Sequence, residues 1–457
     1  MAGNPGMTRK HNLKMLPPQM LEVVDLSHEG QGIAKLDGRA VFVDDALPGE
    51  TIEVQLLQRR KGVQEAKLLQ VIKPSADRVD PKCRHYAICG GCAEQHLSSA
   101  KQLELKQNQL LENMARIAKV EVPQVLAPLQ ADVWNYRRRA RLGARWVPQK
   151  GRTLVGFRER SNSKLADISR CEVLREPLSS LIEPLSILLG SLSVRDKVPQ
   201  VEAAVADNAT ALVIRILEDL ADADMAALQA FRVQHGVQIY LQREGYDSIR
   251  PLHPESLQPL VYGLPAFKLQ FEFLPNDFIQ VNGALNEQMV ALALQLLDVK
   301  PEDEVLDLFC GLGNFSLPLA QRAKSVLGIE GEATLVERAR HNARRNNLGN
   351  VEFMVANLFE EHKDSPFAKR KFSKVLLDPP RAGAREILPV IARCGASPVG
   401  DSDAAQRLVY ISCHPGSLAR DTGILVHELG YALKAAGVLD MFPHTAHVES
   451  VAVFERN

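Results

Sequence analysis

The sequence predicts a multidomain protein with a small β-barrel, a central α+β domain and an α/β domain built on an open, mostly parallel sheet. Its 457 residues are too many for one ordinary domain. Short alternating strands with glycine-rich turns occupy the first part, and apolar strands alternate with amphipathic helices over the last part. We expect the three domains at residues 15–75, 76–274 and 275–457.

The barrel prediction depends on four short strands within residues 15–75. Their sequences are LEVVDL, AVFVDD, TIEVQLL and AKLLQVI, and the turn signals HEGQG, LDGR and LPGE lie between them. Many short strands joined by such turns are typical of a small barrel. Barrels of this kind often bind nucleic acid on one face, and the alternative is a purely structural or dimerising barrel.

The central region contains a polar helical stretch at residues 98–119, which we expect to pack on the last domain. It also contains the basic run WNYRRRARLGARW at residues 134–146. In an extended strand Arg137, Arg139 and Arg141 share one face, so their guanidinium groups can contact phosphates while the aromatic rings stack on exposed bases. The alternative is a solvated basic strand.

Charge is distributed unevenly along the chain. The net charge is zero, which by itself argues against a nucleic-acid partner. Residues 1–170, however, hold 28 basic against 18 acidic residues, whereas residues 171–457 hold 27 against 37. A front half with an excess of ten positive charges indicates contact with a polyanion, unless the charges only cluster over solvated faces.

The composition, 46% hydrophobic and 24% charged, is that of a globular protein. The apolar run at residues 181–192 is too short to span a bilayer and carries Glu183. The first residues, MAGNPGMTRKHNLK, lack the apolar stretch of a secretory signal. We therefore expect a cytoplasmic protein with no membrane contact.

Seven cysteines are present, an odd number that does not suggest a disulfide framework. Four of them form the pattern C-x5-CGGC followed by a distant cysteine, namely Cys83, Cys89, Cys92 and Cys171. Four thiolates can hold zinc or an iron–sulfur cluster, and the residues alone leave both open.

A glycine turn in the last domain indicates a cofactor site. Residues 304–316, EVLDLFCGLGNFS, predict a strand, a tight turn through Gly311 and Gly313, and the start of a helix. The turn lacks the third glycine of a dinucleotide fingerprint, which favours a smaller nucleoside cofactor over a dinucleotide. The competing interpretation is a hydride-transfer enzyme. Polar residues fall at or just past the ends of this and later strands, where ligands bind in open α/β sheets: Asp307, Glu330, Asn357, Asp378 and Cys413.

Four short motifs carry a family resemblance. They are FIQVN at 278–282, DPPR at 378–381, SCHP at 412–415 and HVES at 447–450. Together they resemble the uracil-C5 RNA methyltransferases, and the glycine turn resembles class I S-adenosylmethionine methyltransferases with a Rossmann-like fold. The resemblance implies Cys413 as nucleophile and Glu449 as base, and Phe278 and Arg381 on either side of the target base. It also implies S-adenosyl-L-methionine as cofactor, lined by Gln280, Phe309, Asn314, Glu330, Asn357 and Asp378.

The chemistry explains these residue types. Uracil C5 is too weak a nucleophile to attack a sulfonium methyl group, and a thiolate that adds to C6 makes C5 enolate-like. A base then removes the C5 proton and elimination frees the enzyme, so no catalytic metal is needed. A cysteine at a strand end is more often a buried hydrophobe, which is how we interpret Cys310 and Cys394. The nearby Asp378 and Glu449 favour catalysis for Cys413.

The first two domains extend the resemblance. Residues 28–50, HEGQGIAKLDGRAVFVDDALPGE, with Arg59, Arg60 and Lys61, resemble a TRAM domain, an OB-like RNA-binding barrel. The cysteine pattern resembles the iron–sulfur members of the same family, which implies a [4Fe–4S] cluster on Cys83, Cys89, Cys92 and Cys171. The order of TRAM domain, cysteines and methyltransferase resembles enzymes of 23S ribosomal RNA, whereas tRNA-modifying relatives typically lack the first two.

The resemblance implies a monomeric enzyme that forms 5-methyluridine in 23S ribosomal RNA, with Arg137 and Arg139 on the RNA and no obligate protein partner. The alternatives are the same reaction on another ribosomal uridine or on tRNA, and a non-catalytic RNA-binding assembly factor. A cytosine-C5 methyltransferase is a further alternative, but such RNA enzymes usually carry two catalytic cysteines and only one is well placed here.

Overall fold

The computed structural model describes residues 17–57, 62–160, 162–360, 362, 365–395 and 406–456. The chain divides into an N-terminal unit, Met1–Pro81 with Ala93–Ser98, and a larger unit, Lys82–Cys92 with Ser99–Asn457. The basic residues Arg59, Arg60 and Lys61 lie outside the described residues. Among the residues that are described, no helix has the length and apolar character needed to cross a bilayer.

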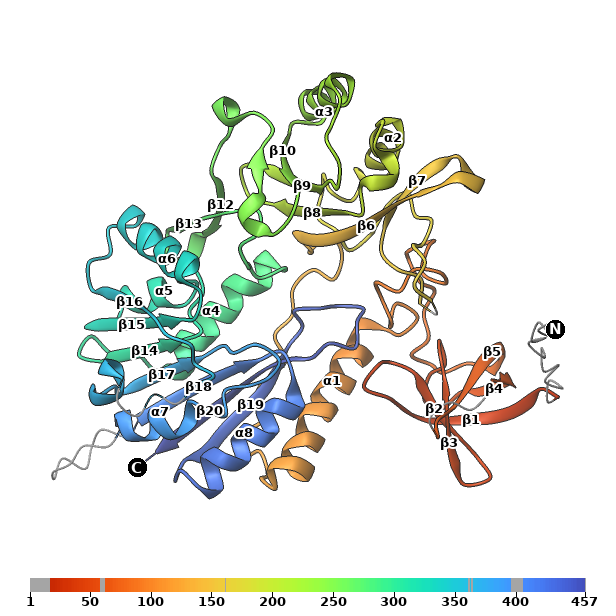
Figure 1. Cartoon of the computed structure of the whole chain (residues 1–457). Helices are drawn as coiled ribbons and strands as arrows, with labels where there is room; N and C mark the ends of the chain where they lie inside the picture. The colour runs from red at the N-terminus through yellow and green to blue at the C-terminus, as the bar shows by residue number, and fades with distance from the viewer. Residues whose placement is uncertain are drawn as a thin grey trace, which may run out of the picture. The chain divides into compact units, whose positions relative to one another are not determined.

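The N-terminal unit contains a closed five-stranded barrel, which confirms the predicted barrel (Figure 1). Its strands are β1 (Gln19–Leu26), β2 (Gly32–Leu36), β3 (Arg39–Val43), β4 (Thr51–Leu56) and β5 (Gln64–Lys73), in the order β1-β2-β3-β5-β4. Alternating residues such as Ile52 and Val54 point into the barrel core, as the period of two requires. The sequence prediction missed β2, whose five residues include a glycine and a lysine.

A six-stranded sheet in the larger unit has the order β11-β10-β9-β8-β6-β7. Its strands are β6 (Arg139–Val147), β7 (Arg152–Gly156), β8 (Gln200–Val205), β9 (Thr210–Arg215), β10 (Val237–Gln242) and β11 (Arg250–Pro251). Helices α2 (Ile182–Ser191) and α3 (Asp222–His235) pack with it. The apolar run at 181–192 is therefore a core helix, with Leu185 and Leu189 fully buried. The hairpin β12 (Leu260–Leu264) and β13 (Leu269–Phe273) follows.

The larger unit also contains a seven-stranded sheet of order β16-β15-β14-β17-β18-β20-β19. Its strands are β14 (Glu304–Leu308), β15 (Ser325–Glu330), β16 (Val351–Val355), β17 (Lys374–Leu377), β18 (Gln406–Ser412), β19 (Ala432–Leu439) and β20 (Glu449–Arg456). The first five are parallel, and β20 is antiparallel to both β18 and β19. This confirms the mostly parallel α/β sheet, although β19 was not expected from the sequence.

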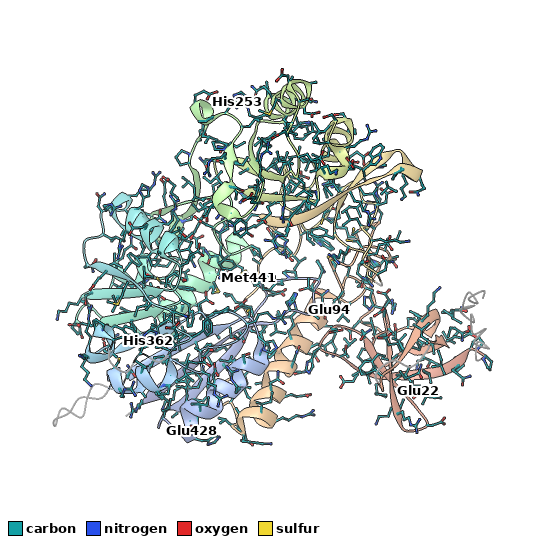
Figure 2. All side chains as sticks on the ribbon, viewed as in Figure 1. Glu22, Glu94, His253, His362, Glu428 and Met441 are labelled. Carbon is teal, nitrogen blue, oxygen red and sulfur yellow. The ribbon has the colours of Figure 1, made fainter. Side chains whose placement is uncertain are left out.

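Helices cover both faces of this sheet because alternate strand residues face opposite cores. Leu376 packs into the core on one face, and its neighbours Val375 and Leu377 pack into the core on the other. The first core takes in α4 (Gly283–Leu297), α5 (Ser316–Ala320) and α6 (Ala333–Arg345). The second takes in α1 (Ser99–Asn113), α7 (Leu388–Gly395) and α8 (Pro415–His427). Figure 1 shows α1 beside α8, and side chains fill both layers in Figure 2.

Candidate active site

The carboxyl ends of β14, β15, β17 and β18 meet at one edge of the seven-stranded sheet because these strands are parallel and adjacent. The strands also align in register, with Leu308 beside Leu377 and Leu377 beside Tyr410. The amide of Asp378 donates to the carbonyl of Leu308 at 3.3 Å, which joins the two strands at this edge. The edge therefore collects the polar residues that follow each strand.

The glycine turn after β14 has the tight backbone that its sequence predicts. Phe309, Gly311 and Gly313 have φ values of 63°, 55° and 95°, in the left-handed region. A Cβ atom on Gly313 would lie 2.7 Å from Leu317 Cδ1, and L side chains rarely adopt its φ, so a substitution there would be strained. At the end of β15, Glu330 accepts a hydrogen bond from the Gly311 amide at 3.1 Å, which ties the turn to the neighbouring strand.

Asp307 and Asp378 are enclosed acids beside this turn. Asp307 is fully buried and accepts a hydrogen bond from Ser316. Burial raises its pKa to about 7, and the neighbouring acids Asp378 and Glu330 add to the increase. Burial also raises the pKa of Asp378 to about 7. Gln280 donates to Asp378 at 3.5 Å, so this predicted cofactor residue lies at the same strand edge.

Two further predicted cofactor residues use their side chains within the protein. Asn314 exchanges two hydrogen bonds with Asn286, both at 2.9 Å, and accepts a third from the Tyr262 hydroxyl at 3.0 Å. Asn357 is exposed and donates to Glu360 at 2.6 Å within a local turn. The sequence placed both residues at the site, but it gave no sign of these internal partners.

Cys413 and Glu449 lie side by side at the strand edge. The β18–β20 register pairs Ser412 with Ser450, and Cys413 and Glu449 are the next residues in that register. Glu449 is 4% exposed and Cys413 is half-buried. Burial raises the pKa of Cys413 to about 11, and the negative charges of Glu449 and Asp378 add to the increase. Burial together with Asp378 raises the pKa of Glu449 well above its ordinary value.

The two residues expected around the target base lie on separate loops, and Phe278 is two residues before Gln280, which contacts Asp378. Phe278 is 65% exposed, so its ring is open to stack on a ligand. Arg381 is exposed, and its charge acts on both Cys413 and His447. Burial lowers the pKa of His447, and Arg381 and Arg137 add to that decrease. Arg381 is therefore close to both Cys413 and His447, and Arg137 is close to His447.

The two arginines expected on the RNA differ in their contacts. The Nε of Arg137 donates to the carbonyl of Arg139 at 3.0 Å, and its charge reaches His447 beside the site. The guanidinium of Arg139 instead donates to the carbonyls of Asn276 and Asp277 and lies 3.8 Å from Glu202. Arg139 therefore fixes the segment that leads to Phe278.

Sequence reasoning missed a buried ion pair next to the site. Lys106 in α1 lies 2.8 Å from Asp440 and donates to the carbonyl of Phe442 at 3.1 Å, with both charged side chains almost fully buried. Gln102 accepts from the His444 amide at 2.9 Å, one turn earlier on α1. These contacts hold residues 440–448, the loop that ends at Glu449 and includes the buried Met441 marked in Figure 2.

We predict that Asp440→Asn lowers the free energy of unfolding by about 3–5 kcal/mol, because it leaves the Lys106 ammonium buried without a counter-charge. The exposed pair Lys101–Glu104 on the same helix provides the control, and Glu104→Gln is expected to change stability by less than about 0.5 kcal/mol. Denaturant unfolding of the three proteins measures both values. Equal shifts for the two variants would contradict the prediction.

The four patterned cysteines lie close enough for their charges to influence one another. Burial raises the pKa of Cys171 to about 12, and Cys92 and Cys89 add to the increase. Burial raises the pKa of Cys89 too, with a contribution from Cys83. No group of three or more His, Cys, Asp or Glu side chains within the described ranges is arranged to hold a single metal ion. The donor set nonetheless fits a sulfur-bridged cluster, which needs four thiolates near one another.

The fold and the strand-edge site define a class I S-adenosylmethionine-dependent methyltransferase. The family model described as tRNA (Uracil-5-)-methyltransferase matches residues 98–457, and a TRAM domain model matches residues 19–69. The chain belongs to the tRNA (uracil-5-)-methyltransferase family and carries a TRAM domain before the family region.

The chain is similar over nearly its whole length to curated relatives. It is 48% identical to the 23S rRNA (uracil(1939)-C(5))-methyltransferase RlmD of Methylococcus capsulatus, over 98% of this chain and 100% of the relative. It is 47% identical to the protein of the same name from Thiobacillus denitrificans, over 96% and 99%. A solved structure, the Pyrococcus abyssi tRNA (uracil-54, C5)-methyltransferase in complex with S-adenosyl-L-homocysteine, has a TM-score of 0.71 and 26% identity, over 95% of this chain and 100% of that one.

Proposed function

We propose that the protein transfers a methyl group from S-adenosylmethionine to C5 of a uridine in 23S ribosomal RNA. The observation that carries this proposal is the juxtaposition of Cys413 and Glu449 at the sheet edge that also bears the glycine turn. A thiol, a base and a nucleoside-sized cofactor turn are the three parts that C5 methylation of uracil requires. A non-catalytic binding protein would not need all three.

In the proposed mechanism the Cys413 thiolate adds to C6, and the electron pair of the C5–C6 bond moves toward O4. C5 then attacks the sulfonium methyl group in line, and S-adenosylhomocysteine leaves. Glu449 accepts the C5 proton, the C6–S bond breaks, and the product is 5-methyluridine with the thiolate restored. Because burial raises the pKa of Glu449, its carboxylate is a stronger base than an exposed one.

The cofactor lies, in this proposal, between the glycine turn and Asp378. The residues proposed to line it are Gln280, Phe309, Asn314, Glu330, Asn357 and Asp378. The backbone of Asn314 is better placed to contribute than its amide, which Asn286 and Tyr262 already engage. Phe278 and Arg381 would hold the extruded uracil, and they would offset part of the unstacking cost. Arg137 is proposed to contact the RNA directly, and Arg139 to position Phe278.

The raised pKa of Cys413 predicts a steep pH dependence of its alkylation. Between pH 7 and pH 9 the pH is well below the Cys413 pKa of about 11, so the fraction of reactive thiolate rises about tenfold per pH unit. Iodoacetamide labelling of the Cys413 peptide, followed by mass spectrometry, measures the slope. Glu449→Gln removes one nearby negative charge, so we expect faster labelling at pH 8. A rate that levels off below pH 9 would be inconsistent with this environment.

The choice of RNA is the less direct part of the proposal. The relatives at 47–48% identity are named for uracil 1939 of 23S rRNA, and we propose the equivalent uridine as the target. Although tRNA-modifying relatives are expected typically to lack the additional domains, the Pyrococcus abyssi tRNA enzyme is similar over 95% of the chain. Transfer RNA is therefore the second candidate substrate.

Incubation with methyl-labelled S-adenosylmethionine and either unmodified 23S rRNA or unmodified tRNA separates the two. We expect label in 5-methyluridine of the ribosomal RNA. Label in tRNA alone would keep the mechanism and overturn the substrate, and no label in any RNA from a folded protein would favour the assembly-factor alternative.

We further propose that the enzyme acts in the cytoplasm as a monomer, with three functional domains at residues 15–75, 76–274 and 275–457.

We also propose that Cys83, Cys89, Cys92 and Cys171 hold a [4Fe–4S] cluster with a structural or RNA-docking role. Binding to iron would hold these cysteines as thiolates, although burial and the neighbouring cysteines raise the pKa values of Cys89 and Cys171. Anoxically purified protein is expected to contain about four irons per chain, and Cys89→Ser to lose them. Cys394→Ser, at a buried cysteine in α7, is the control that keeps the iron. If Cys89→Ser abolished turnover while folding and RNA binding stayed intact, the docking role would be wrong.

A further inference from the structure

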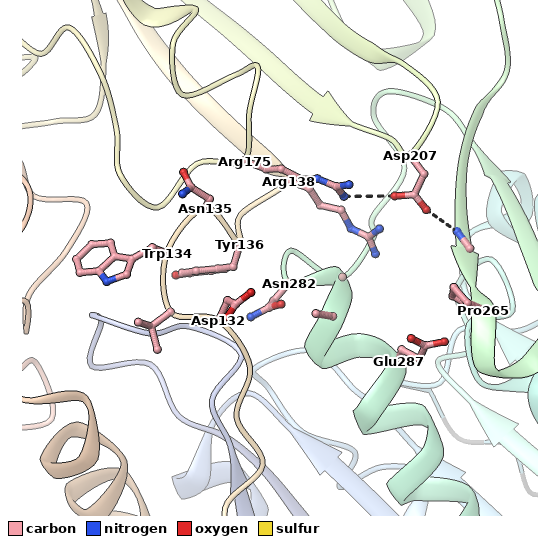
Figure 3. A pocket seen from close by; sticks show the side chains of 14 residues that line it. Asp132, Trp134, Asn135, Tyr136, Arg138, Arg175, Asp207, Pro265, Asn282 and Glu287 are labelled. Atoms are coloured by element: carbon pink, nitrogen blue, oxygen red, sulfur yellow. Dashed lines mark hydrogen bonds and ion pairs between the residues drawn. The ribbon is translucent and has the colours of Figure 1, made fainter.

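A cavity of about 630 Å³ lies in the larger unit, and Arg138, Asp207 and Asn282 are among the residues that line it (Figure 3). Its wall is formed by residues 132–136, Arg138, Arg175, Asp207, Gly263, Pro265 and the first turns of α4. It is not part of the proposed cofactor or target-base site, although Asn282 in its wall is only two residues from Gln280. Its volume is in the range of small-molecule and cofactor sites.

Arg138 is a buried cation in this wall. It is 2% exposed, its Nε donates to the Gln280 carbonyl at 3.0 Å, and its guanidinium lies over the Tyr262 ring at 4.8 Å. Among the described residues it has no carboxylate within ion-pair distance. The nearby Asp207 instead pairs with Arg175 at 3.3 Å and accepts from the Gly263 amide at 2.9 Å. Burial lowers the pKa of Arg138, and the charge of Asp207 offsets only part of that decrease, so an anion next to the guanidinium would stabilise the buried cation.

The N-terminus of α4 adds a second positive feature at the same place. A Cβ atom on Gly283 would lie 3.1 Å from the Arg138 guanidinium carbon, so the arginine head is next to the first residue of this 15-residue helix. The free amides and dipole of a helix N-terminus attract anions, and they repel a cation that stays unneutralised. Both features favour an anion in the cavity.

Asn282 supplies a hydrogen-bond donor that has no partner. It is 1% exposed, and its Oδ1 caps α4 by accepting from the Leu285 amide at 3.2 Å. Its Nδ2 has no hydrogen-bond partner among the described residues. Buried amide groups are seldom left unsatisfied, and those that are need an explanation. Asn282 lines the cavity, so a turn of its buried amide would bring this donor to an acceptor bound there.

We propose that the cavity binds one backbone phosphate of the RNA substrate, with Arg138 as counter-charge and Asn282 as donor. This inference rests on the proposed function, because the same short segment would hold the target base at Phe278 and the phosphate at Asn282. Asp207 is neutralised by Arg175, and Glu287 accepts from the Ala266 amide at 2.6 Å. Together with Asp132 these acids oppose a highly charged ligand more strongly than they oppose a single phosphodiester.

The test combines Asn282→Asp with a scan of neutral methylphosphonate linkages along an RNA fragment around the target uridine. Aspartate keeps the helix cap but faces the phosphate with a negative charge, so we expect about tenfold weaker RNA binding. At one position, a neutral linkage should weaken RNA binding by the wild-type protein about tenfold. The same neutral linkage should not change RNA binding by the Asn282→Asp protein. Gln295→Glu, exposed at the far end of α4, adds the same charge and is the control without effect. Arg138→Gln should lower the salt slope of binding by about one.

If the losses of RNA binding caused by Asn282→Asp and by a neutral linkage added up at every linkage, the inference would be overturned. Calorimetry with inorganic phosphate distinguishes a free anion from RNA: phosphate binding that Asn282→Asp abolishes, with RNA binding equal in both proteins, would also overturn it. Methylation of the unmodified fragment by wild-type protein is measured in parallel. If the wild-type protein methylates the fragment but the effects of the variant and of each neutral linkage are additive, only the phosphate site is rejected. If the wild-type protein binds the fragment but never methylates it, the proposed function is rejected.

Discussion

Replacement of Cys413 by serine is expected to lower the methylation rate by about 10⁴-fold or more, because a serine hydroxyl does not supply the nucleophile that adds to uracil C6. The substitution replaces one sulfur atom by oxygen at a half-buried strand end, so the fold and the affinity for the cofactor should change little. Single-turnover methylation measures the rate, and calorimetric titration with S-adenosylhomocysteine measures the affinity.

Cys310 provides a matched control for this variant. It lies in the glycine turn at the same sheet edge, but it is buried and its sulfur faces Gly311. Cys310→Ser should keep most of the activity if the enzyme still folds and binds cofactor. A Cys413→Ser protein with more than about a tenth of wild-type activity would exclude covalent catalysis by this residue.

The second large effect is expected for Glu449→Gln. Without a base the C5 proton stays in place, so the methylated adduct between RNA and Cys413 should accumulate while turnover falls by about 10³-fold. The glutamine is isosteric and neutral, and it also removes the repulsion that raises the pKa of Cys413, so adduct formation should not slow. Denaturing gel electrophoresis with labelled cofactor detects the adduct.

Glu455→Gln on the same strand tests whether the effect is local. Glu455 is at the opposite end of β20, where it pairs with Arg407 and Lys434. We expect normal turnover and no trapped RNA for this variant. If Glu449→Gln turned over normally as well, proton removal would have to be assigned to another group.

Much of the fold could be predicted because local signals agree with the final structure. The strands that lead to Glu330 and Cys413 are apolar runs bounded by turns, and their period and length match β15 and β18. By contrast, β2 and β19 were missed. Each is short of bulky β-branched residues, and barrel closure and pairing with β20 determine them more than their own composition does.

The residue types of the candidate site could also be predicted, but their partners could not. Asp440 pairs with Lys106 across more than three hundred positions, and nothing in either local sequence indicates the other. The same holds for Asn314 and Asn286, and for the contact of Arg139 with the loop before Phe278. Such contacts depend on how whole elements pack, and a single sequence does not record that.

The central claim is that Cys413 attacks C6 of a uracil in RNA. The most direct test is incubation of the anoxically purified protein with S-adenosylmethionine and a 23S rRNA fragment that carries 5-fluorouridine at the target. Fluorine at C5 cannot leave as a proton does, so the reaction should stop at a covalent complex that survives denaturation. We expect mass spectrometry to place the fluorinated, methylated nucleotide on the Cys413 peptide. Methylation of the unmodified fragment without any such complex from the fluorinated one would contradict the claim.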